Sequence, residues 1–340
     1  MITGMPDVLD FQIVNALQLY PRISWVQLSR VINVDASTLS RRWQALIQNR
    51  LVWTNCEEAD EANAREQTVS ALVEIRCTPG MRGDVIAALG RQGPIFSIHC
   101  TSGARDLYIM VSMPSLALMD RYIDEHVVVV PGIAGTQTHY FRAIYQEASS
   151  WRFAALTAAQ ATAVERLRPP MAVVEKKPAY QELVASLATD VRRSAADVQQ
   201  EVGRSISVVS RDLDVLLSAD WVRWRIDFAH MGMGFATAAV LWLSVEQAEL
   251  NRVAVSMKLL PQVRFCASAT GEANLAVMMW LRNLRELDEI ELRIASVFAK
   301  VQITDRWIVP RIAKRDGHIL DLDSRRLRFV PNEQLPLFED

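Results

Sequence analysis

A short segment near the start of the chain, residues 35–44, carries side chains that can bind phosphate groups and base edges. Arginine pairs with guanine or phosphate, glutamine with adenine, and hydroxyl groups with either. Asp35 is a suitable N-cap for a helix from Ala36 to about Gln48, and Leu39 and Trp43 mark its buried side. The outward residues are the candidate nucleic-acid contacts: Ser37, Thr38, Ser40, Arg41, Arg42 and Gln44.

The same pattern occurs a second time in the chain. Residues 20–54 align with residues 190–224 without a gap, and a repeat of this length indicates duplicated domains rather than a solenoid. We therefore predict an intramolecular pseudo-dimer. The identical pairs include Arg22 with Arg192, Ser24 with Ser194, Ser37 with Ser207, Ser40 with Ser210 and Arg41 with Arg211. The candidate nucleic-acid contacts of the second copy are Arg204, Ser207, Ser210 and Arg211, and Arg22 is a further candidate in the first.

The elements that must position these residues are predicted from capping and periodicity. A first helix ends before Pro21, and Ser24 with Gln27 has the spacing of a capping box that opens a second helix. Asn33 supplies a tight turn before the helix that Asp35 caps. This order is a helix-turn-helix, whose last helix enters the DNA major groove. We assign one such domain to residues 1–54 and another to residues 177–226.

The two helix-turn-helix domains differ in charge. Residues 20–54 hold five arginines and one acid, whereas residues 190–225 hold six of each. Asp212 stands where the first domain has Arg42, and Asp214 adds a second carboxylate. Nonspecific DNA affinity rests on counterion release by cationic side chains. We therefore predict an asymmetric binder, in which the second domain is weaker or reads a different half-site.

From Val69 onward the apolar period becomes strand-like, and the order of predicted elements is βαββαβ. This is the ferredoxin-like order, predicted for residues 68–147 and again for residues 233–314. Such a sheet has an open edge that favours pairing with a second copy. An acidic segment, Glu57 to Glu66, precedes the first copy, a linker covers residues 148–176, and residues 315–340 are expected to be a loosely attached tail.

Composition excludes several classes of protein. The chain has 340 residues, 50% of them hydrophobic, and a net charge of −2, which does not fit a globally basic, histone-like binder. The four cysteines form no C-x-x-C pair, and no His/Cys cluster has metal spacing, so we expect neither metal nor cofactor. No basic-then-apolar leader and no apolar run of membrane length are present, so we expect a cytoplasmic protein without a membrane partner.

Together these features resemble the leucine-responsive regulator/AsnC (Lrp/AsnC) family of transcription regulators. The recognition-helix pattern appears as Asp-Ala-Ser-Thr-Leu-Ser-Arg-Arg-Trp at residues 35–43, and as Ser-Ile-Ser-Val-Val-Ser-Arg-Asp-Leu at 205–213. The family's Gly-x-x-Asp turn appears as Gly103-Ala-Arg-Asp106 and as Gly271-Glu-Ala-Asn274. The resemblance implies an α+β chain with a duplicated winged helix-turn-helix and ferredoxin-like sensing domain. It also implies binding to double-stranded DNA, regulation by a small effector such as an amino acid, and assembly into homodimers or larger homo-oligomers.

The resemblance also places an effector at the interfaces of the sensing domains. The contacts that it implies are Thr101, Ser102, Gly103, Asp106, Thr270, Gly271 and Asn274. The competing interpretation is that Gly103 and Gly271 simply make β-turns and that Asp106 bonds the turn backbone.

Two other functions are carried as alternatives: a tandem enzyme similar to the sirohaem decarboxylases, and a small-molecule sensor that does not bind DNA. Against the enzyme, no phosphate loop or nucleophile elbow is present, and Arg264-Phe265-Cys266 stands where a His–Arg cluster would be expected. Of the five histidines, only His99 and His139 lie in predicted strands of one sensing domain and could meet in space, and we expect a structural role for them rather than a metal site. We expect no enzymatic activity.

Overall fold

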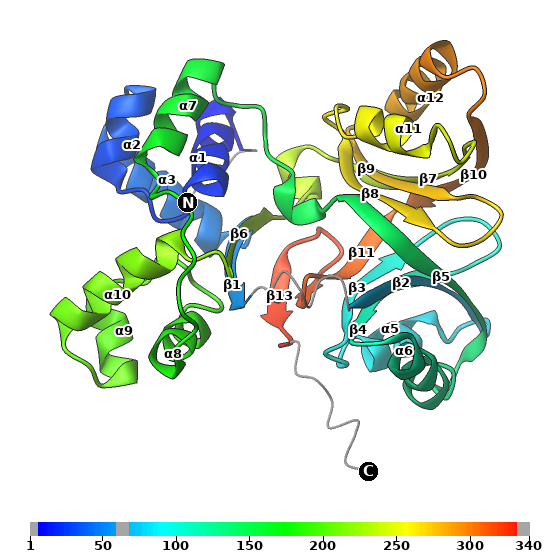
Figure 1. The fold of residues 1–340 in the computed structure, drawn as a ribbon, viewed down its shortest axis with the longest axis horizontal. Helices are drawn as coiled ribbons and strands as arrows, with labels where there is room; N and C mark the ends of the chain where they lie inside the picture. Colours follow the sequence, from blue (N-terminus) through cyan, green and yellow to red (C-terminus); the bar gives the residue numbers. More distant parts are fainter. Residues whose placement is uncertain (1–5, 59–67, 332–340) are drawn as a thin grey trace. The chain divides into compact units, whose positions relative to one another are not determined.

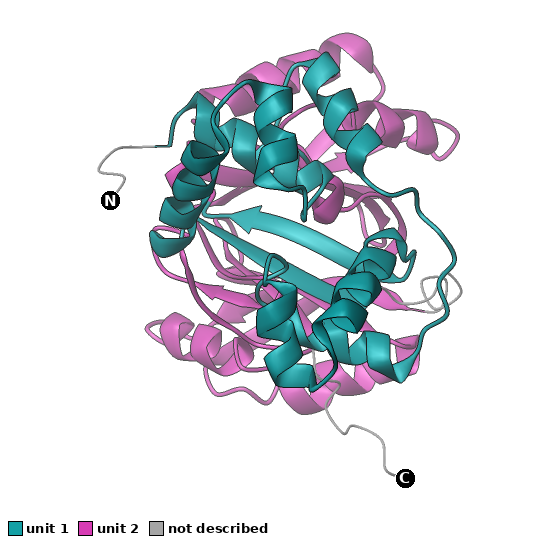
Figure 2. Cartoon of the chain, turned by 90° about the vertical axis from the view of Figure 1, so that its left-hand side faces the viewer, with its two compact units in different colours: residues 1–65, 152–229 teal, residues 66–151, 230–340 magenta. Residues whose placement is uncertain are grey.

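The structure is a computed structural model, and it describes residues 6–58 and 68–331 (Figure 1). The chain divides into two compact units (Figure 2). Unit 1 is formed by residues 1–65 and 152–229 and unit 2 by residues 66–151 and 230–340. Each unit therefore contains one domain type in two copies, contributed by both halves of the sequence.

Unit 1 contains both helix-turn-helix domains, as the sequence predicts. Capping boxes open the second helix of each domain, Ser24 with Gln27 and Ser194 with Asp197. The tight turns that follow are made by Asn33 and Gly203, both in the left-handed region. The first domain comprises α1 (Val8–Leu19), α2 (Trp25–Ile32), α3 (Ala36–Gln48) and β1 (Val52–Glu58), and the second α8 (Pro178–Ser186), α9 (Ala195–Val202), α10 (Ile206–Ser218) and β6 (Val222–Phe228).

The strand that follows each recognition helix joins the two domains of unit 1. Strands β1 and β6 pair antiparallel along their whole length, from Val52 opposite Phe228 to Glu58 opposite Val222. The linker helix α7 (Ala158–Leu167) is capped by Thr157 and packs against α1 and α2. Of the acidic segment, Glu57 and Glu58 belong to β1, and residues 59–66 lie outside the described residues.

Unit 2 contains the βαββαβ order twice, which confirms the ferredoxin-like prediction. The first copy comprises β2 (Val69–Cys77), α5 (Arg82–Leu89), β3 (Ile95–Cys100), β4 (Leu107–Met113), α6 (Leu116–Tyr122) with a π-helical turn (Ile123–Val127), and β5 (Ile133–Gln146). The second comprises β7 (Thr237–Ser244), α11 (Leu250–Met257), β8 (Val263–Ala269), β9 (Leu275–Leu281), α12 (Arg285–Val297) and β10 (Gln302–Val309). In each copy the alternate apolar residues of the strands pack against the helices in a separate core.

The last strand of each copy is shared with the other copy. Strand β5 pairs with β2 of its own copy through residues 133–140 and then with β8 of the second copy through residues 141–146. In the second copy β10 pairs with β7, and after Pro310 the chain continues as β11 (Arg311–Arg315), which pairs with β3 of the first copy. The edge at β8 is thus covered by β5 of the first copy, and the edge at β3 by β11, which follows the second copy.

The prediction of a loosely attached tail was wrong for its described part. Strands β12 (His318–Leu320) and β13 (Arg326–Phe329) extend the sheet beyond β11. Gly317, at a φ of +77°, makes the tight turn between β11 and β12, and the side chains of His318 and Leu320 are buried. The strand pairing gives these backbone groups their hydrogen bonds. Residues 332–340 lie outside the described residues.

Candidate nucleic-acid interface and effector loops

Helix α3 carries the predicted contact residues on its solvent side. Asp35 caps the helix, because its Oδ1 accepts hydrogen bonds from the amide of Ser37 at 2.8 Å and that of Thr38 at 3.4 Å. Leu39, Trp43 and Leu46 face the core of the domain. The contact residues then divide into the exposed Ser37, Arg41 and Gln44 and the half-buried Thr38, Ser40 and Arg42.

The two adjacent arginines of α3 have different surroundings. Arg41 is exposed and forms no ion pair within residues 6–58 and 68–331. Arg42 instead bridges two carboxylates of α1: its Nη1 lies 2.7 Å from Asp7 Oδ2 and 3.2 Å from Asp10 Oδ2. Asp7 is the N-cap of α1, so Arg42 ties α3 to the start of that helix. Arg41 is therefore the arginine free to bind a ligand.

The recognition helix of the second domain is neutralised internally. Asp212, buried on α10, accepts from Arg204 Nη1 at 3.2 Å and from Arg211 Nη2 at 3.2 Å. Arg204 also donates to the carbonyl oxygen of Ala179 in α8, so it holds neighbouring helices of the domain together. Ser207 and Ser210 are exposed. Cationic groups already paired with a carboxylate gain less from a phosphate, and this supports the predicted weakness of the second domain.

Arg22 occupies a different place from the other predicted contacts. Its guanidinium donates to the carbonyl oxygens of Val191 and Arg193 in the second helix-turn-helix domain, 3.1 Å away in the case of Arg193. Burial lowers the pKa of Arg22. Because its donors are directed to the other domain, we leave Arg22 out of the contact surface proposed below.

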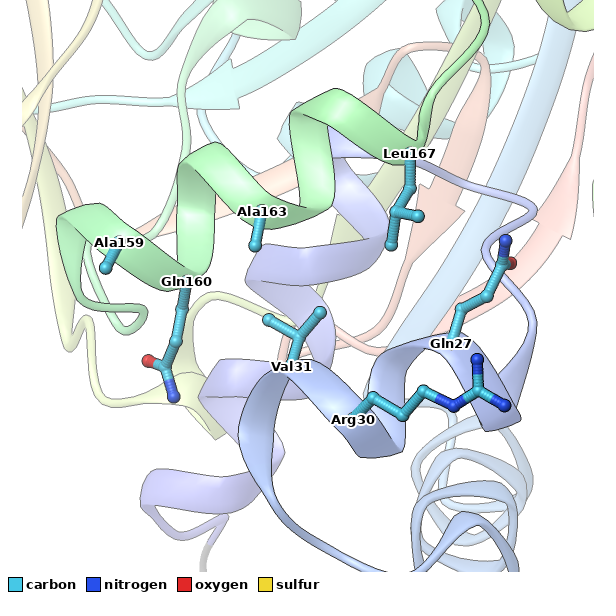
Figure 3. A pocket seen from close by; sticks show the side chains of 7 residues that line it. All are labelled: Gln27, Arg30, Val31, Ala159, Gln160, Ala163 and Leu167. Atoms are coloured by element: carbon cyan, nitrogen blue, oxygen red, sulfur yellow. The ribbon is translucent and has the colours of Figure 1, made fainter.

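A shallow groove of about 440 Å³ runs between α2 and α7 (Figure 3). Its lining is mostly apolar, with Val31 and Leu167 across from one another and the polar ends of Gln27 and Arg30 on the α2 side. Arg30 thus lies where α2 meets the linker helix α7, away from the contact residues of α3. No predicted contact residue lines this groove.

The two predicted effector loops are built in the same way in unit 2. Gly103 and Gly271 adopt positive φ angles, +96° and +126°. Asp106 Oδ2 accepts from the amide of Cys77 at 2.7 Å, and Asn274 forms two hydrogen bonds with the backbone of Val245, at 2.7 and 3.0 Å. Both side chains therefore connect the loop to the end of the neighbouring strand. Asn274 uses both ends of its amide for this purpose.

The loops also join the two copies of the ferredoxin-like domain. The amide of Ser102 donates to the carbonyl oxygen of Ile308 at 2.9 Å, and Ser102 Oγ accepts from the amide of Ile308. Thr270 makes the same two contacts with Tyr140 of the first copy. Thr101 is buried beside Ser102. The predicted effector residues thus lie where one copy meets the other.

A charged network that the sequence analysis missed lies next to these loops. Arg105 pairs with Glu74 and, at 3.2 Å, with Asp305, and it stacks 4.1 Å over the ring of Trp307. His139 Nε2 lies 2.8 Å from Glu74 Oε1. Burial raises the pKa of Glu74, but hydrogen bonds from His139 and Arg105 outweigh it, so the pKa lies below its ordinary value. The position of Arg105 inside the Gly103–Asp106 turn was the available signal.

In the second copy, the positions that correspond to Glu74 and His139 are aromatic. The strands pair in the same register in both copies, with Leu72 opposite His139 and Val240 opposite Trp307. Trp242 accordingly takes the place of Glu74, and its ring lies 5.1 Å from that of Trp307. Among the described residues, Arg105 Nη1 and Trp242 Nε1 are buried donors without a hydrogen-bond partner.

The two histidines that could meet, His99 and His139, have different partners. His99 stacks on Tyr108 with ring centroids 4.5 Å apart, whereas His139 contacts Glu74 and the carbonyl oxygen of Thr270. The two histidines lie on β3 and β5, strands that are not neighbours in the sheet. The two histidines therefore do not meet, because strand order, which the sequence pattern left open, separates them.

A second cluster corrects the expectation that unit 2 lacks a His–Arg group. Arg264 lies 3.7 Å over the ring of Trp280, and Arg315 lies 5.0 Å from the same ring. His230 stacks on Trp280 with centroids 5.3 Å apart. All four side chains are buried. They come from four separate segments, so no local motif could reveal the cluster.

Within residues 6–58 and 68–331, no group of three or more His, Cys, Asp or Glu side chains could hold a metal ion. In the same part of the chain, no helix is long and apolar enough to cross a bilayer.

Comparison with known proteins agrees with the first domain and with the whole fold. An AsnC-type helix-turn-helix domain is recognised over residues 7–47. An uncharacterised HTH-type transcriptional regulator of Pyrococcus abyssi is 26% identical over 148 residues, which is 44% of this chain and 90% of the relative. A similar regulator of Pyrococcus horikoshii is 25% identical over 148 residues, again 44% of this chain and 90% of the relative.

Among solved structures, the siroheme decarboxylase NirDL, in a co-complex with an iron-uroporphyrin III analogue, has the same fold. The TM-score is 0.56 at 13% identity, and the match covers 90% of this chain and 92% of the decarboxylase. At this identity the likeness shows the fold alone. The first domain is of the AsnC type, and the regulators that match span less than half of this chain. The structure shows two helix-turn-helix domains and two ferredoxin-like domains. The chain thus carries an AsnC-type helix-turn-helix domain and is similar to Lrp/AsnC-type regulators, with a helix-turn-helix domain and a ferredoxin-like domain each present in duplicate.

Proposed function

We propose that the chain is a DNA-binding transcriptional regulator of the Lrp/AsnC type and that its first helix-turn-helix domain makes the main contact. The observation that carries the proposal is the solvent face of α3. Arg41 and Gln44 are exposed there, three positions apart on an AsnC-type domain, and neither has a partner among the described residues. The names of the Pyrococcus relatives, HTH-type transcriptional regulators, support the same function.

The proposed contact surface consists of α3 in the first domain and α10 in the second. Ser37, Thr38, Ser40 and Gln44 accompany Arg41, and Arg42 presents only the part of its side chain that its ion pairs leave exposed. In the second domain Ser207, Ser210 and Arg211 are accessible, while Arg204 is directed inward. The second domain therefore contributes less affinity.

Replacing Arg41 by Ala is expected to weaken DNA binding about 5- to 150-fold, which corresponds to one lost base or phosphate contact. The matched control is Arg211→Ala at the equivalent position of α10, where Asp212 already pairs with the arginine, and a smaller loss is expected. Fluorescence anisotropy with duplex DNA from upstream of the chain's own gene, at two salt concentrations, measures both. The salt slope should fall by about one in the Arg41 variant.

Two results would contradict the proposal. Weak binding that is equal on random duplex and indifferent to Arg41→Ala would exclude a DNA reader built on α3. Equal losses in the Arg41 and Arg211 variants would keep the regulator and remove the asymmetry between its domains.

We further propose that an effector acts at the loops around Gly103 and Gly271, with Thr101, Ser102, Asp106, Thr270 and Asn274 in their walls. The buried donors Arg105 Nη1 and Trp242 Nε1 nearby support a ligand with acceptor atoms, such as the carboxylate of an amino acid. Because Ser102 and Thr270 join the two copies, a ligand there would act on the pairing of the sensing domains. A regulator of this kind acts in the cytoplasm. Pairing of two chains would present four helix-turn-helix domains to DNA.

One observation favours a second candidate, a tandem enzyme acting on a tetrapyrrole. Arg264, Arg315 and His230 surround Trp280, and buried arginines are suited to bind propionate or acetate side chains. Titration with sirohaem, followed by absorbance, tests this candidate. A saturable spectral change that is lost in Arg264→Ala would support it, and an unchanged spectrum would exclude it.

A further inference from the structure

Two arginines at equivalent positions of unit 1 each donate hydrogen bonds to the main chain on both sides of the other. Arg22 lies between α1 and α2, and Arg192 lies between α8 and α9. Arg22 donates to the carbonyl oxygens of Val191 and Arg193, the two neighbours of Arg192 in the sequence. Arg192 donates to the carbonyl oxygens of the two neighbours of Arg22, Pro21 at 2.7 Å and Ile23 at 3.0 Å. The exchange is reciprocal and uses four main-chain carbonyl groups.

This contact is directional and partly buried. Burial first, and the charge of Arg22 second, lower the pKa of Arg192 to about 10, so its guanidinium keeps its proton at neutral pH. A planar guanidinium that bonds two carbonyl groups fixes an angle as well as a distance. An apolar contact of the same area would hold the domains together but would tolerate sliding, because hydrophobic association has no direction.

The exchange is connected to the first recognition helix through aromatic rings. The guanidinium of Arg192 stacks 4.2 Å over the ring of Trp25, the first residue of α2. Trp25 in turn packs against Trp43 of α3, with ring centroids 6.4 Å apart. Arg192 of the second domain therefore contacts the side chain that supports the helix carrying Arg41.

We propose that Arg22 and Arg192 are positioning residues that set the separation and orientation of α3 and α10, and hence the half-site spacing that the chain accepts on DNA. The inference rests on the proposed DNA-binding function. It places the control of spacing inside unit 1, in the loops that precede α2 and α9. One base pair of added spacing rotates a half-site by about 34° around the DNA axis, so a fixed pair of helices must discriminate strongly between spacings.

The first test measures the distance between α3 and α10 in the absence of DNA. Spin labels at Gln44→Cys and Asp214→Cys, exposed residues of α3 and α10, are introduced with Cys77→Ser, because Cys77 is the native cysteine that is not buried. Double electron–electron resonance should give one narrow distribution of the distance between the two labels. In the Arg22→Lys/Arg192→Lys variant it should broaden at least twofold, since an ammonium group does not bond two carbonyl groups in one plane. An unchanged distribution overturns the proposal, whatever the protein does on DNA.

The second test measures spacing on DNA. A half-site is selected from randomised duplexes, and two copies are placed at a series of separations. The native chain should bind its preferred spacing at least tenfold more tightly than duplexes one or two base pairs longer. The double lysine variant should reduce that ratio at least threefold with the affinity for a single half-site unchanged. Arg30→Lys, in the α2–α7 groove, is the matched control and should retain the native ratio.

The outcomes separate the inference from the function on which it rests. Native binding to single and paired sites with an identical spacing ratio in the variant overturns the inference alone. Absence of specific binding in the native chain overturns the proposed regulator function. The distances between the spin labels then decide whether Arg22 and Arg192 fix the positions of α3 and α10. The single variant Arg22→Lys keeps the bonds of Arg192, and it provides the same readouts if the double variant does not fold.

Discussion

Lowering the pH from 7 to 5 is expected to destabilise unit 2 by about 2 kcal/mol through the single residue His99. Burial, reinforced by the neighbouring Arg315, lowers the pKa of His99 from 6.5 to about 3. Between these two values the unfolded chain binds a proton at His99 and the native chain does not. Stability therefore falls as the pH is lowered through this window, by about 1.4 kcal/mol per pH unit.

The measurement is the urea dependence of unfolding at pH 7, 6 and 5 for the native chain and for His99→Gln. The variant should lose the part of the slope that His99 supplies, about 1.4 kcal/mol per pH unit in this range. His126→Gln, at a half-buried site on the π-helical turn, is the control and should retain the native slope. Equal slopes in the native chain and in His99→Gln would show that His99 binds its proton equally well in the native and unfolded states, and would contradict the prediction.

Replacing Arg42 by Ala is expected to destabilise the first helix-turn-helix domain by about 3–5 kcal/mol. Asp10 is fully buried, and its carboxylate accepts only from Arg42 and from the amide of Asp7 among the described residues. Removal of the guanidinium leaves a buried charge with one hydrogen bond. Hydrogen exchange of peptides from α1 and α3 gives the local opening free energy, which separates this domain from the rest of the chain.

Two further variants make this prediction specific. Arg41→Ala, one position earlier on the same helix, removes an exposed arginine and should change the opening free energy by less than about 0.5 kcal/mol. Asp10→Asn combined with Arg42→Ala removes the stranded charge and should recover part of the loss. If Arg42→Ala and Arg41→Ala open equally easily, the ion pair contributes nothing to the domain.

Local chemistry predicted the helices well because each signal lies within a few residues. The Ser24–Gln27 capping box and the Asp35 cap both form as expected. The βαββαβ order likewise followed from apolar periodicity. The tail failed for the opposite reason: β11 is fixed by β3, more than two hundred residues earlier in the chain, and no local pattern encodes that partner.

The candidate site shows the same division. Repetition of a residue in both halves was interpreted as shared contact with a ligand, and this led to Arg22. In a pseudo-symmetric chain, a residue near the axis is also repeated because it binds the other copy, as Arg22 and Arg192 do. The Glu74–Arg105–His139 network could not be predicted, because it depends on strand register and is absent from the second copy.

The exchange of β5 and β11 between the two copies has a consequence for how this chain can evolve. In two separate subunits every substitution appears on both sides of the symmetry axis at once, and assembly depends on concentration. Here the partner strand arrives on the same polypeptide, so pairing is unimolecular and proceeds at any dilution. Each copy is then free to change alone. The first copy has Glu74 and His139 where the second has tryptophans. Likewise, the second helix-turn-helix domain has acquired Asp212, while the first keeps its positive charge.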